Sequence, residues 1–226
     1  MSMKQSLTLM LLADYATKQA NTLFPDPNPV RQAETKRFLP LVLNRLERSL
    51  KGLTNPYFHR DGAVFFDHLH SEQYSMFLYL LANECGRAGE KHRRMATKFY
   101  LLNKALHGLE VYYQVEMPEV FWFAHAVGTV LGRARYGNGF VVMQGCTVGN
   151  VSGHYPVLGE RVVLCAGSSV LGDCRLGHDV CVGAGSLLIN ALVPAGSTVV
   201  GRGKDLRVLS ETSDLVQQYF RSFPKP

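Results

Sequence analysis

The sequence has no long hydrophobic run. Near the N-terminus the segment SLTLMLLA is apolar over only eight residues and is followed by Asp14 and Lys18. A helix that spans a bilayer needs about 20 consecutive apolar residues. The segment therefore predicts an amphipathic helix rather than a membrane span or a cleaved signal, and a cytoplasmic location is expected.

Charged side chains are also scarce. The chain of 226 residues is 19% charged, and its 24 basic and 18 acidic side chains give a formal net charge of +6. No segment of the chain forms a basic stripe. The basic residues of the run KHRRMATK, at residues 91–98, stand at helical spacing, which is typical of a solvated helix face. The composition therefore gives little support to nucleic-acid binding.

The cysteines lack the spacing of a metal site. There are five of them, an odd number, without a CxxC pair or a Cys/His ligand pattern. We expect small, half-buried free thiols in a reducing compartment and no bound metal. They are Cys85, Cys146, Cys165, Cys174 and Cys181.

The first half of the chain has a helical period. Apolar residues recur at helical spacing in four stretches, and the prolines of FPDPNP end the first of them. The segment TNPYFHRDG predicts a turn, and the apolar stripe that includes Tyr74 and Phe77 is expected to pack in the core. The expected helices cover residues 6–22, 31–53, 71–86 and 91–109, within a helical domain at 1–114.

A different period begins near Val115. From residue 158 to residue 193 an aliphatic residue occupies every sixth position. Three such hexads make one coil of a three-sided parallel β-helix, in which the first residue points inward and a small residue permits the corner. The sequence thus predicts an α+β chain with a parallel β-helix over 115–209 and a helical tail over 210–226, which starts near Ser210 or Thr212. The repeating residues are Leu158, Leu164, Val170, Leu176, Val182 and Leu188.

The repeat is broken once, by NVSGHYPV at residues 150–157. An insertion in a solenoid leaves the prism as a loop, and such loops commonly lie on the binding face. This insertion contains His154, and His125 stands in FWFAHAVGTVLG, where the β-helix begins. Either histidine alone is most simply a surface residue, but the pair beside an inserted loop indicates a site.

These segments resemble the serine acetyltransferases. The resemblance rests on HAVGTVLG, MQGCTVG, the protruding loop with a histidine, CAGSSVLGD and VGAGSLL, and it covers residues 115–205. It implies a left-handed parallel β-helix built from hexapeptide repeats and an acyltransferase that uses acetyl-CoA without a metal. It also implies a homotrimer or a dimer of trimers, with each active site between neighbouring subunits.

The resemblance assigns roles to single residues. His125 matches the general base of the family, and His154 matches the loop histidine that lines the same site. In the family an upstream carboxylate orients the base; here the segment VEMPEVFWFAH is shorter by about one hexad, so Glu116 is the preferred partner and Glu119 the alternative. The expected contacts to CoA are Ala166 and Ala184 at the corners, with Arg202 and Lys204 near its phosphates.

The implied chemistry is general-base catalysis. An imidazole with a pKa near 6.5 can take the proton of a hydroxyl as that hydroxyl attacks a thioester, which typically accelerates the reaction about 10²–10⁴-fold. A carboxylate on the far ring nitrogen fixes the tautomer. The sequence shows no Ser or Cys nucleophile with a recognisable base beside it. Direct transfer is therefore preferred over an acyl-enzyme.

Two positions depart from the family pattern. Serine-specific members carry an aspartate before the catalytic histidine and an arginine before the loop histidine, whereas this chain has Ala124 and Gly153. Without these charged contacts a zwitterionic serine is poorly held. The acceptor therefore stays open between L-serine, a sugar, a nucleotide sugar and a modified serine-like alcohol. The aromatic residues 121–123 and Tyr155 either stack on a sugar ring or cap the prism.

Other functions compete with this prediction. The runner-up is a sugar or nucleotide-sugar O- or N-acetyltransferase of polysaccharide biosynthesis. A non-enzymatic β-helix scaffold is the second alternative, although a scaffold needs no pair of histidines. A hydratase like the γ-type carbonic anhydrases needs three histidine ligands. His178 would have to join His125 and His154, but it lies inside a regular hexad away from the loop.

Overall fold

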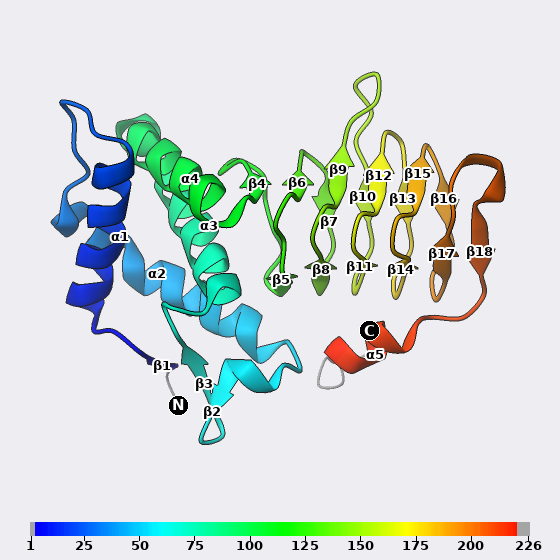
Figure 1. Cartoon of the computed structure of the whole chain (residues 1–226), viewed down its shortest axis with the longest axis horizontal. Helices are drawn as coiled ribbons and strands as arrows, with labels where there is room; N and C mark the ends of the chain where they lie inside the picture. The colour runs from blue at the N-terminus through cyan, green and yellow to red at the C-terminus, as the bar shows by residue number, and fades with distance from the viewer. Residues whose placement is uncertain (1–2, 221–226) are drawn as a thin grey trace.

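The computed structural model describes residues 3–220, in which a helical half is followed by a β-solenoid (Figure 1). The four helices expected from the sequence are confirmed, with their ends shifted by a few residues. Thr8 caps the first of them by accepting a hydrogen bond from the N–H of Leu11. The helices are α1 (Leu9–Leu23), α2 (Gln32–Lys51), α3 (Ser71–Arg87) and α4 (Arg93–His107).

Helix α3 is the centre of the helical half. It packs against both α2 and α4, and its residues from Glu72 to Ala82 are all buried. The apolar stripe predicted to be core is confirmed, because Tyr74 and Phe77 are buried and stacked with ring centroids 5.6 Å apart. A helix buried on nearly every side has little room for charge. A glutamate within it therefore needs a specific partner.

The helical half also contains a small sheet that the sequence patterns did not predict. The segment TNPYFHRDG does turn, at Asp61 and Gly62, which have left-handed φ values of 52° and 73° as a tight hairpin turn requires. It also supplies the 3-10 helix η1 (Pro56–Phe58) and the strand β2 (His59–Arg60). The sheet has the order β1-β3-β2, with β1 at Lys4–Gln5 and β3 at Ala63–Phe66.

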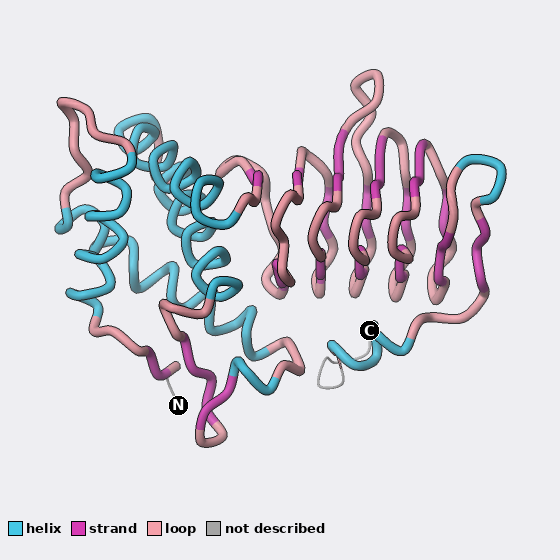
Figure 2. Tube along the Cα trace, in the orientation of Figure 1, coloured by secondary structure: helices cyan, strands magenta, loops and turns pink. Residues whose placement is uncertain are grey.

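The second half is a three-sided prism of parallel strands (Figure 2). One face holds β4 (Glu110–Val111), β6 (Val130–Leu131), β9 (Thr147–Gly149), β12 (Ser169–Leu171) and β15 (Leu187–Ile189). A second holds β5 (Phe121–Phe123), β8 (Phe140–Val142), β11 (Val163–Leu164), β14 (Cys181–Val182), β17 (Thr198–Val200) and the antiparallel β18 (Arg207–Leu209). The third holds β7 (Arg135–Tyr136), β10 (Val157–Leu158), β13 (Arg175–Leu176) and β16 (Leu192–Val193).

The six-residue period is the register of this prism. Leu164 pairs with Val182, eighteen residues and three hexads later. All six repeating residues predicted from the sequence are buried, with at most 4% of their surface exposed. The predicted left-handed parallel β-helix is therefore confirmed. Its first strand, β4, lies a few residues before the start expected at 115.

The C-terminal tail returns to the helical half (Figure 1). The helix α5 (Asp214–Tyr219) begins after Ser213, which caps it, and residues 221–226 of the expected tail lie outside the described residues. The Thr212 hydroxyl donates to the carbonyl of Asp179 in the prism, and the carbonyl of Tyr219 accepts from the N–H of Thr54 in the helical half. Between residues 3 and 220, no helix combines the length and the apolar character needed to cross a bilayer.

Candidate functional site

His125 stands at the corner that follows β5, the first strand of its sheet. The residues just before it are buried, whereas 81% of the His125 side chain is exposed. Its φ of 49° places a non-glycine residue in the left-handed region, which the fold must stabilise. The carbonyl of His125 accepts a hydrogen bond of 2.7 Å from the N–H of Val127, and this tight turn directs the imidazole away from the prism.

The carboxylate that holds this corner is Glu72, in the first turn of α3. Its Oε1 accepts from the backbone N–H of His125 at 3.1 Å and lies 2.9 Å from Nδ1 of the same histidine. Its Oε2 accepts from the indole N–H of Trp122 at 2.9 Å. Only 8% of the Glu72 side chain is exposed. The bonds satisfy the buried charge and explain the left-handed backbone at His125.

This contact fixes the tautomer of the imidazole. A carboxylate can only accept hydrogen bonds, so the Glu72 charge, 2.9 Å from Nδ1 of His125, favours the tautomer with a proton on that nitrogen. In the neutral ring Nε2 is then the unprotonated nitrogen of a side chain that is 81% exposed. An oriented imidazole with a free, exposed nitrogen is the arrangement of a general base.

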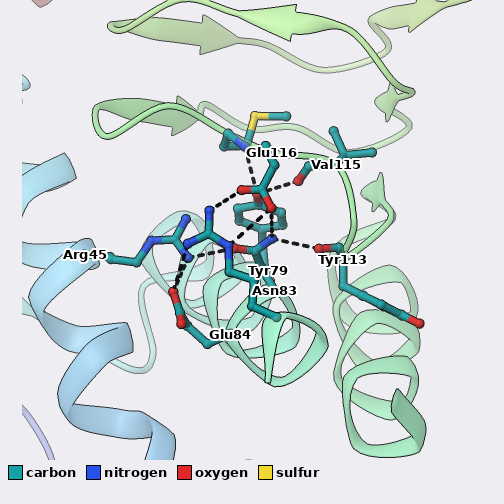
Figure 3. A network of polar contacts seen from close by, with 9 residues as sticks. Arg45, Tyr79, Asn83, Glu84, Tyr113, Val115 and Glu116 are labelled. Carbon is teal, nitrogen blue, oxygen red and sulfur yellow. Dashed lines mark hydrogen bonds and ion pairs between the residues drawn. The ribbon is translucent and has the colours of Figure 1, made fainter. Parts of the chain in front are cut away.

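The pairing of Glu116 with His125 that the sequence suggested is wrong. Figure 3 shows Glu116 in a network near the C-terminal end of α3, where its Oε1 accepts from Nε of Arg87 at 3.2 Å and from Nδ2 of Asn83 at 3.3 Å. The physical reason is that this segment is shorter than in the family pattern. Residues 115–120 run directly into β5, and the Glu116 carboxylate turns toward Arg87 of the helical half.

The alternative partner, Glu119, does not reach His125 either. It faces Arg48 of α2, with 3.7 Å between its Oε2 and Nη1 of the arginine. Glu116 and Glu119 thus belong to the junction between helices and prism, together with the ion pair of Arg45 and Glu84. The sequence offered one signal for the true partner: Glu72 lies one turn before the buried Ser75 and Met76. A glutamate on the buried side of an apolar helix is unusual.

His154 lies in the loop between β9 and β10, which projects from the prism (Figure 1). It forms an isolated bridge with Val151 around Ser152 and Gly153, and its side chain is exposed. The cavities beside His125 contain no residue of this loop. Within one chain, the structure therefore does not bring the two predicted histidines together.

The residues predicted to contact CoA share one corner of the prism. Ala166 and Ala184 lie at equivalent turns of successive coils, where the carbonyl of Ala166 accepts from the N–H of Gly185 at 2.8 Å. Arg202 lies on the next coil and donates from Nε to the carbonyl of Gly185 at 2.6 Å. Lys204 follows in the 3-10 helix η3 (Gly203–Asp205) and is exposed. The same corner begins at His125.

Two cavities flank Glu72 and His125. The larger, of about 640 Å³, is built by the segment around η1, the start of α3, Trp122 and the helix α5. The smaller, of about 120 Å³, lies on the side of α4 and includes His107, Ala126 and Val127. The smaller cavity thus adjoins the corner that carries Ala166 and Ala184, whereas the larger one opens between the helical half and the C-terminal tail.

The thiols and acidic groups offer no competing centre. All five cysteines are free and buried, and burial raises the pKa of the Cys85 thiol. A hydrogen bond with Cys165 lowers the pKa of Cys181 to about 7, but Cys181 is buried and lines neither cavity. Among residues 3–220 no three His, Cys, Asp or Glu side chains gather as metal ligands. His178, the third histidine considered for a metal, accepts from the N–H of Glu160.

Solved structures share this fold. The serine acetyltransferase of Neisseria gonorrhoeae superposes with a TM-score of 0.69 over 92% of this chain and 81% of its own, at 18% identity. The Brucella abortus serine acetyltransferase in complex with coenzyme A superposes with a TM-score of 0.66 over 90% of this chain and 83% of its own, also at 18% identity. At such identities the likeness shows the fold alone.

Sequence relatives carry the same name. A serine acetyltransferase of Staphylococcus xylosus is 28% identical over 133 residues, and one of Synechococcus elongatus is 35% identical over 105 residues. The matches span 57% and 44% of this chain but only 60% and 43% of those relatives. No protein-family model matches the chain.

One relative is matched over most of its length. The serine acetyltransferase of Helicobacter pylori (strain 26695) is 32% identical over 122 residues, which are 49% of this chain and 69% of the relative. Together with the hexapeptide-repeat prism, this similarity shows that the chain belongs to the serine acetyltransferase family.

Proposed function

We propose that this chain is an acetyl-CoA-dependent O-acetyltransferase that moves the acetyl group directly to an acceptor hydroxyl, with His125 as the general base. The observation that carries the proposal is the contact between Glu72 and His125. It gives an exposed imidazole one defined tautomer and a buried negative charge behind it. This is the arrangement needed to remove a proton from a hydroxyl at neutral pH.

The proton follows a short path. Nε2 of His125 takes the proton from the acceptor hydroxyl while the new bond from oxygen to the acetyl carbon forms. Glu72 stabilises the positive charge that develops on the ring, because its carboxylate lies 2.9 Å from Nδ1. When the bond from carbon to sulfur breaks, His125 returns the proton to the leaving sulfur. The ring ends the cycle neutral and ready for the next acceptor.

The corner column is the proposed track for acetyl-CoA. The donor supplies a thioester carbonyl, and a long flexible thiol arm fits along a corner of small residues. Ala166 and Ala184 keep two successive coils of that corner free of large side chains, and the exposed Gln144 occupies the equivalent turn nearer His125. Arg202 and Lys204 place two cations at the far end, where phosphates need them. The column ends at Val127 and His125, so the thioester would reach the base from the smaller cavity.

Direct transfer is preferred to an acyl-enzyme. The described cysteines lie in the core, and the sulfur with the lowered pKa, Cys181, is separated from both cavities. Ser71 lines the larger cavity and precedes Glu72, but the Glu72 carboxylate is already bonded to His125 and Trp122. Direct attack by the acceptor hydroxyl on the thioester therefore needs fewer catalytic side chains than an acyl-enzyme mechanism.

The expected assembly belongs to this proposal. A homotrimer, or a dimer of trimers, would allow the His154 loop of one copy to reach the His125 of another. Val130 on β6 and Ile189 on β15 are exposed apolar side chains on one sheet of the prism, which supports contact with a second copy there. Light scattering on the purified chain would give three or six times the chain mass. The cytoplasmic location stays a prediction.

The proposed function is tested by thiol release from acetyl-CoA in the presence of an acceptor panel, run with wild type and His125→Ala. We expect acceptor-dependent release from the wild type and at least about 100-fold less from the variant. Glu72 keeps its bonds to the indole N–H of Trp122 and the backbone N–H of residue 125 in this variant, so a folded protein with unchanged affinity for CoA is the control. Full activity in His125→Ala, or the absence of transfer to every acceptor, contradicts the proposal.

A further inference from the structure

The larger cavity beside His125 has the features of an acceptor site. It encloses about 640 Å³ within a single chain, between η1, the first turn of α3, the end of β5 and α5. Sites for drug-sized ligands occupy about 300–1,000 Å³. The cavity is therefore far roomier than a three-carbon amino acid requires, and Glu72 and His125 form part of its wall.

The part of the cavity wall formed by residues 3–220 offers little charge for a zwitterion. Among the residues that the structure describes, none of those lining it is lysine or arginine. Glu72, the one carboxylate among the described lining residues, already accepts from the indole N–H of Trp122 and the backbone N–H of His125, and it lies 2.9 Å from Nδ1 of that histidine. The 150–157 loop contains no lysine or arginine either, so a neighbouring copy that placed this loop here would add no permanent cation for an acceptor carboxylate. A charged ligand group that is bound without an oppositely charged partner loses its hydration, and no protein contact compensates for that loss.

The lining suits a polar ring instead. Tyr57 stands at the rim with 78% of its surface exposed, and Trp122 and Tyr219 pack edge to face with centroids 5.1 Å apart. Asn55 and Gln218 contribute side-chain amides. Aromatic faces cover the apolar face of a sugar ring, while amides and imidazoles can exchange hydrogen bonds with hydroxyls in both directions.

One lining residue has an unused polar atom. His70 precedes α3 and lines the cavity, and its Nδ1 is buried without a hydrogen-bond partner among residues 3–220. Its ring contacts Phe58 edge to face, which holds the imidazole in place. A ligand hydroxyl would pair with this nitrogen only after the ring turns, because Nδ1 has almost no accessible surface.

We propose that the acceptor is an uncharged, polyhydroxylated ring, namely a hexose or N-acetylhexosamine glycoside, bound in this cavity with one hydroxyl against Nε2 of His125. This inference rests on the proposed function. Acetyl-CoA reaches the base along the Ala166–Ala184 corner, and the sugar reaches it from the opposite side. The tail contributes directly to recognition, because Gln218 and Tyr219 of α5 form one wall.

The test compares acceptors of different charge on the full-length protein. The probes are methyl α-D-glucopyranoside, the methyl α-glycoside of N-acetylglucosamine, methyl β-D-galactopyranoside and L-serine, each with acetyl-CoA and with detection of the acetylated product by mass spectrometry. We expect kcat/KM for at least one glycoside to exceed that for L-serine by at least about 10-fold. Transfer to L-serine that equals or exceeds every glycoside overturns this inference and leaves the proposed function intact. Transfer to no probe overturns both.

Variants at the rim locate the sugar. Tyr57→Ala removes an exposed ring and is expected to raise KM for the accepted glycoside about 10-fold while KM for acetyl-CoA stays unchanged. Tyr57→Phe keeps the ring and should behave like the wild type. An unchanged glycoside KM in Tyr57→Ala, with glycoside transfer intact, shows that the sugar binds elsewhere and overturns this placement.

Discussion

Glu72 and His125 are 53 residues apart in the chain, and 2.9 Å separate Oε1 of the glutamate from Nδ1 of the histidine. One comes from the buried helix α3 and the other from the first corner of the prism. The proposed base is therefore assembled across the junction of the two halves. A chain reduced to its hexapeptide repeats would lose the carboxylate while keeping the imidazole.

The first prediction concerns that carboxylate. Glu72→Gln keeps the shape of the side chain but removes its charge, and one of its two oxygens becomes an N–H donor that cannot accept from His125 or Trp122. We expect kcat for acetyl transfer to fall by about 10²–10³-fold, because the imidazolium loses its counter-charge and the tautomer is no longer fixed. Steady-state kinetics with the best acceptor measure this loss.

Glu116→Gln is the matched control. Its carboxylate is half exposed and pairs with Arg87 and Asn83, near the C-terminal end of α3 (Figure 3), whereas Glu72 lies in the first turn. A half-exposed ion pair contributes about 0–1 kcal/mol. The control should therefore keep kcat within about 2-fold and lower the unfolding midpoint only slightly. A larger loss of kcat in Glu116→Gln than in Glu72→Gln would reverse the assignment of the two glutamates.

The second prediction concerns the cationic end of the corner. Arg202 is held by its bond to the carbonyl of Gly185, which leaves the rest of the guanidinium exposed. We expect Arg202→Ala to weaken acetyl-CoA binding about 5- to 10-fold without changing kcat, and the difference to shrink at high salt. Isothermal titration with CoA at two salt concentrations measures it.

Arg175→Ala is the control for charge alone. Arg175 is an exposed arginine on β13, a different face of the prism, where it pairs with Asp173. Its removal changes the net charge of the chain by the same amount as Arg202→Ala. Equal effects of the two substitutions on CoA affinity would mean that the corner is not the donor track.

The sequence was sufficient to predict the prism because its signal is local and periodic. Leu164 and Val182 repeat at a spacing that only stacked coils explain, and both are fully buried. The place of His125 at the start of the prism could be predicted from the same six-residue repeat. Glu72 could not be located in this way, because an acidic residue in the first turn of a helix is favourable on its own. Its role depends on how α3 packs against β5, and this packing produces no periodic pattern in the sequence.

The small sheet shows the same limit. Strands β2 and β3 are short, and the segment TNPYFHRDG, which contains β2 and ends just before β3, indicates a turn because of its Pro, Asn and Asp-Gly residues. The turn is real, but the strands on either side of it form only because β1 adds a third partner from the N-terminus. A pairing between segments about 60 residues apart is not visible in local propensity.

The third prediction tests the stacking of coils. At one corner the glycines approach so closely that a Cβ on Gly159 would lie 2.5 Å from the carbonyl oxygen of Gly177. The obstacle is backbone, which cannot move aside within a continuous column. We expect Gly159→Ala to cost about 3 kcal/mol or more of unfolding free energy. Thermal unfolding should then shift down by about 6–12 °C for a chain of this size.

Gly149→Ala is the control that separates the steric clash between coils from the general effect of replacing a glycine by alanine. Gly149 lies in β9 of the same prism, and a Cβ there would contact only Leu171, at an ordinary distance of 3.6 Å. Its substitution should change stability by less than about 1 kcal/mol. Similar destabilisation of both variants would show that the close glycine contacts do not set the spacing of the coils.

The last prediction is a pH dependence that arises at His107. This residue ends α4 and lines the smaller cavity together with Glu72 and His125, and its Nδ1 lies 2.8 Å from Oδ1 of Asn103. Burial disfavours the charged ring and lowers the pKa of His107 from 6.5 to about 4, although the bond with Asn103 opposes this. The unfolded chain therefore binds a proton more readily than the folded one below pH 6.5.

The sign follows from this difference. The contribution of His107 to stability is fully present above pH 6.5 and is lost as the pH falls toward about 4. The two pKa values set an upper limit of about 3 kcal/mol, and solvent screening of the partly exposed ring reduces this to about 1–2 kcal/mol. Urea unfolding at several pH values between 7.5 and 4.5 measures the decline in the wild type. His107→Gln does not titrate in this range, so its unfolding free energy should decline less steeply by that amount. Parallel declines in the two proteins would show that protonation of His107 is not linked to unfolding.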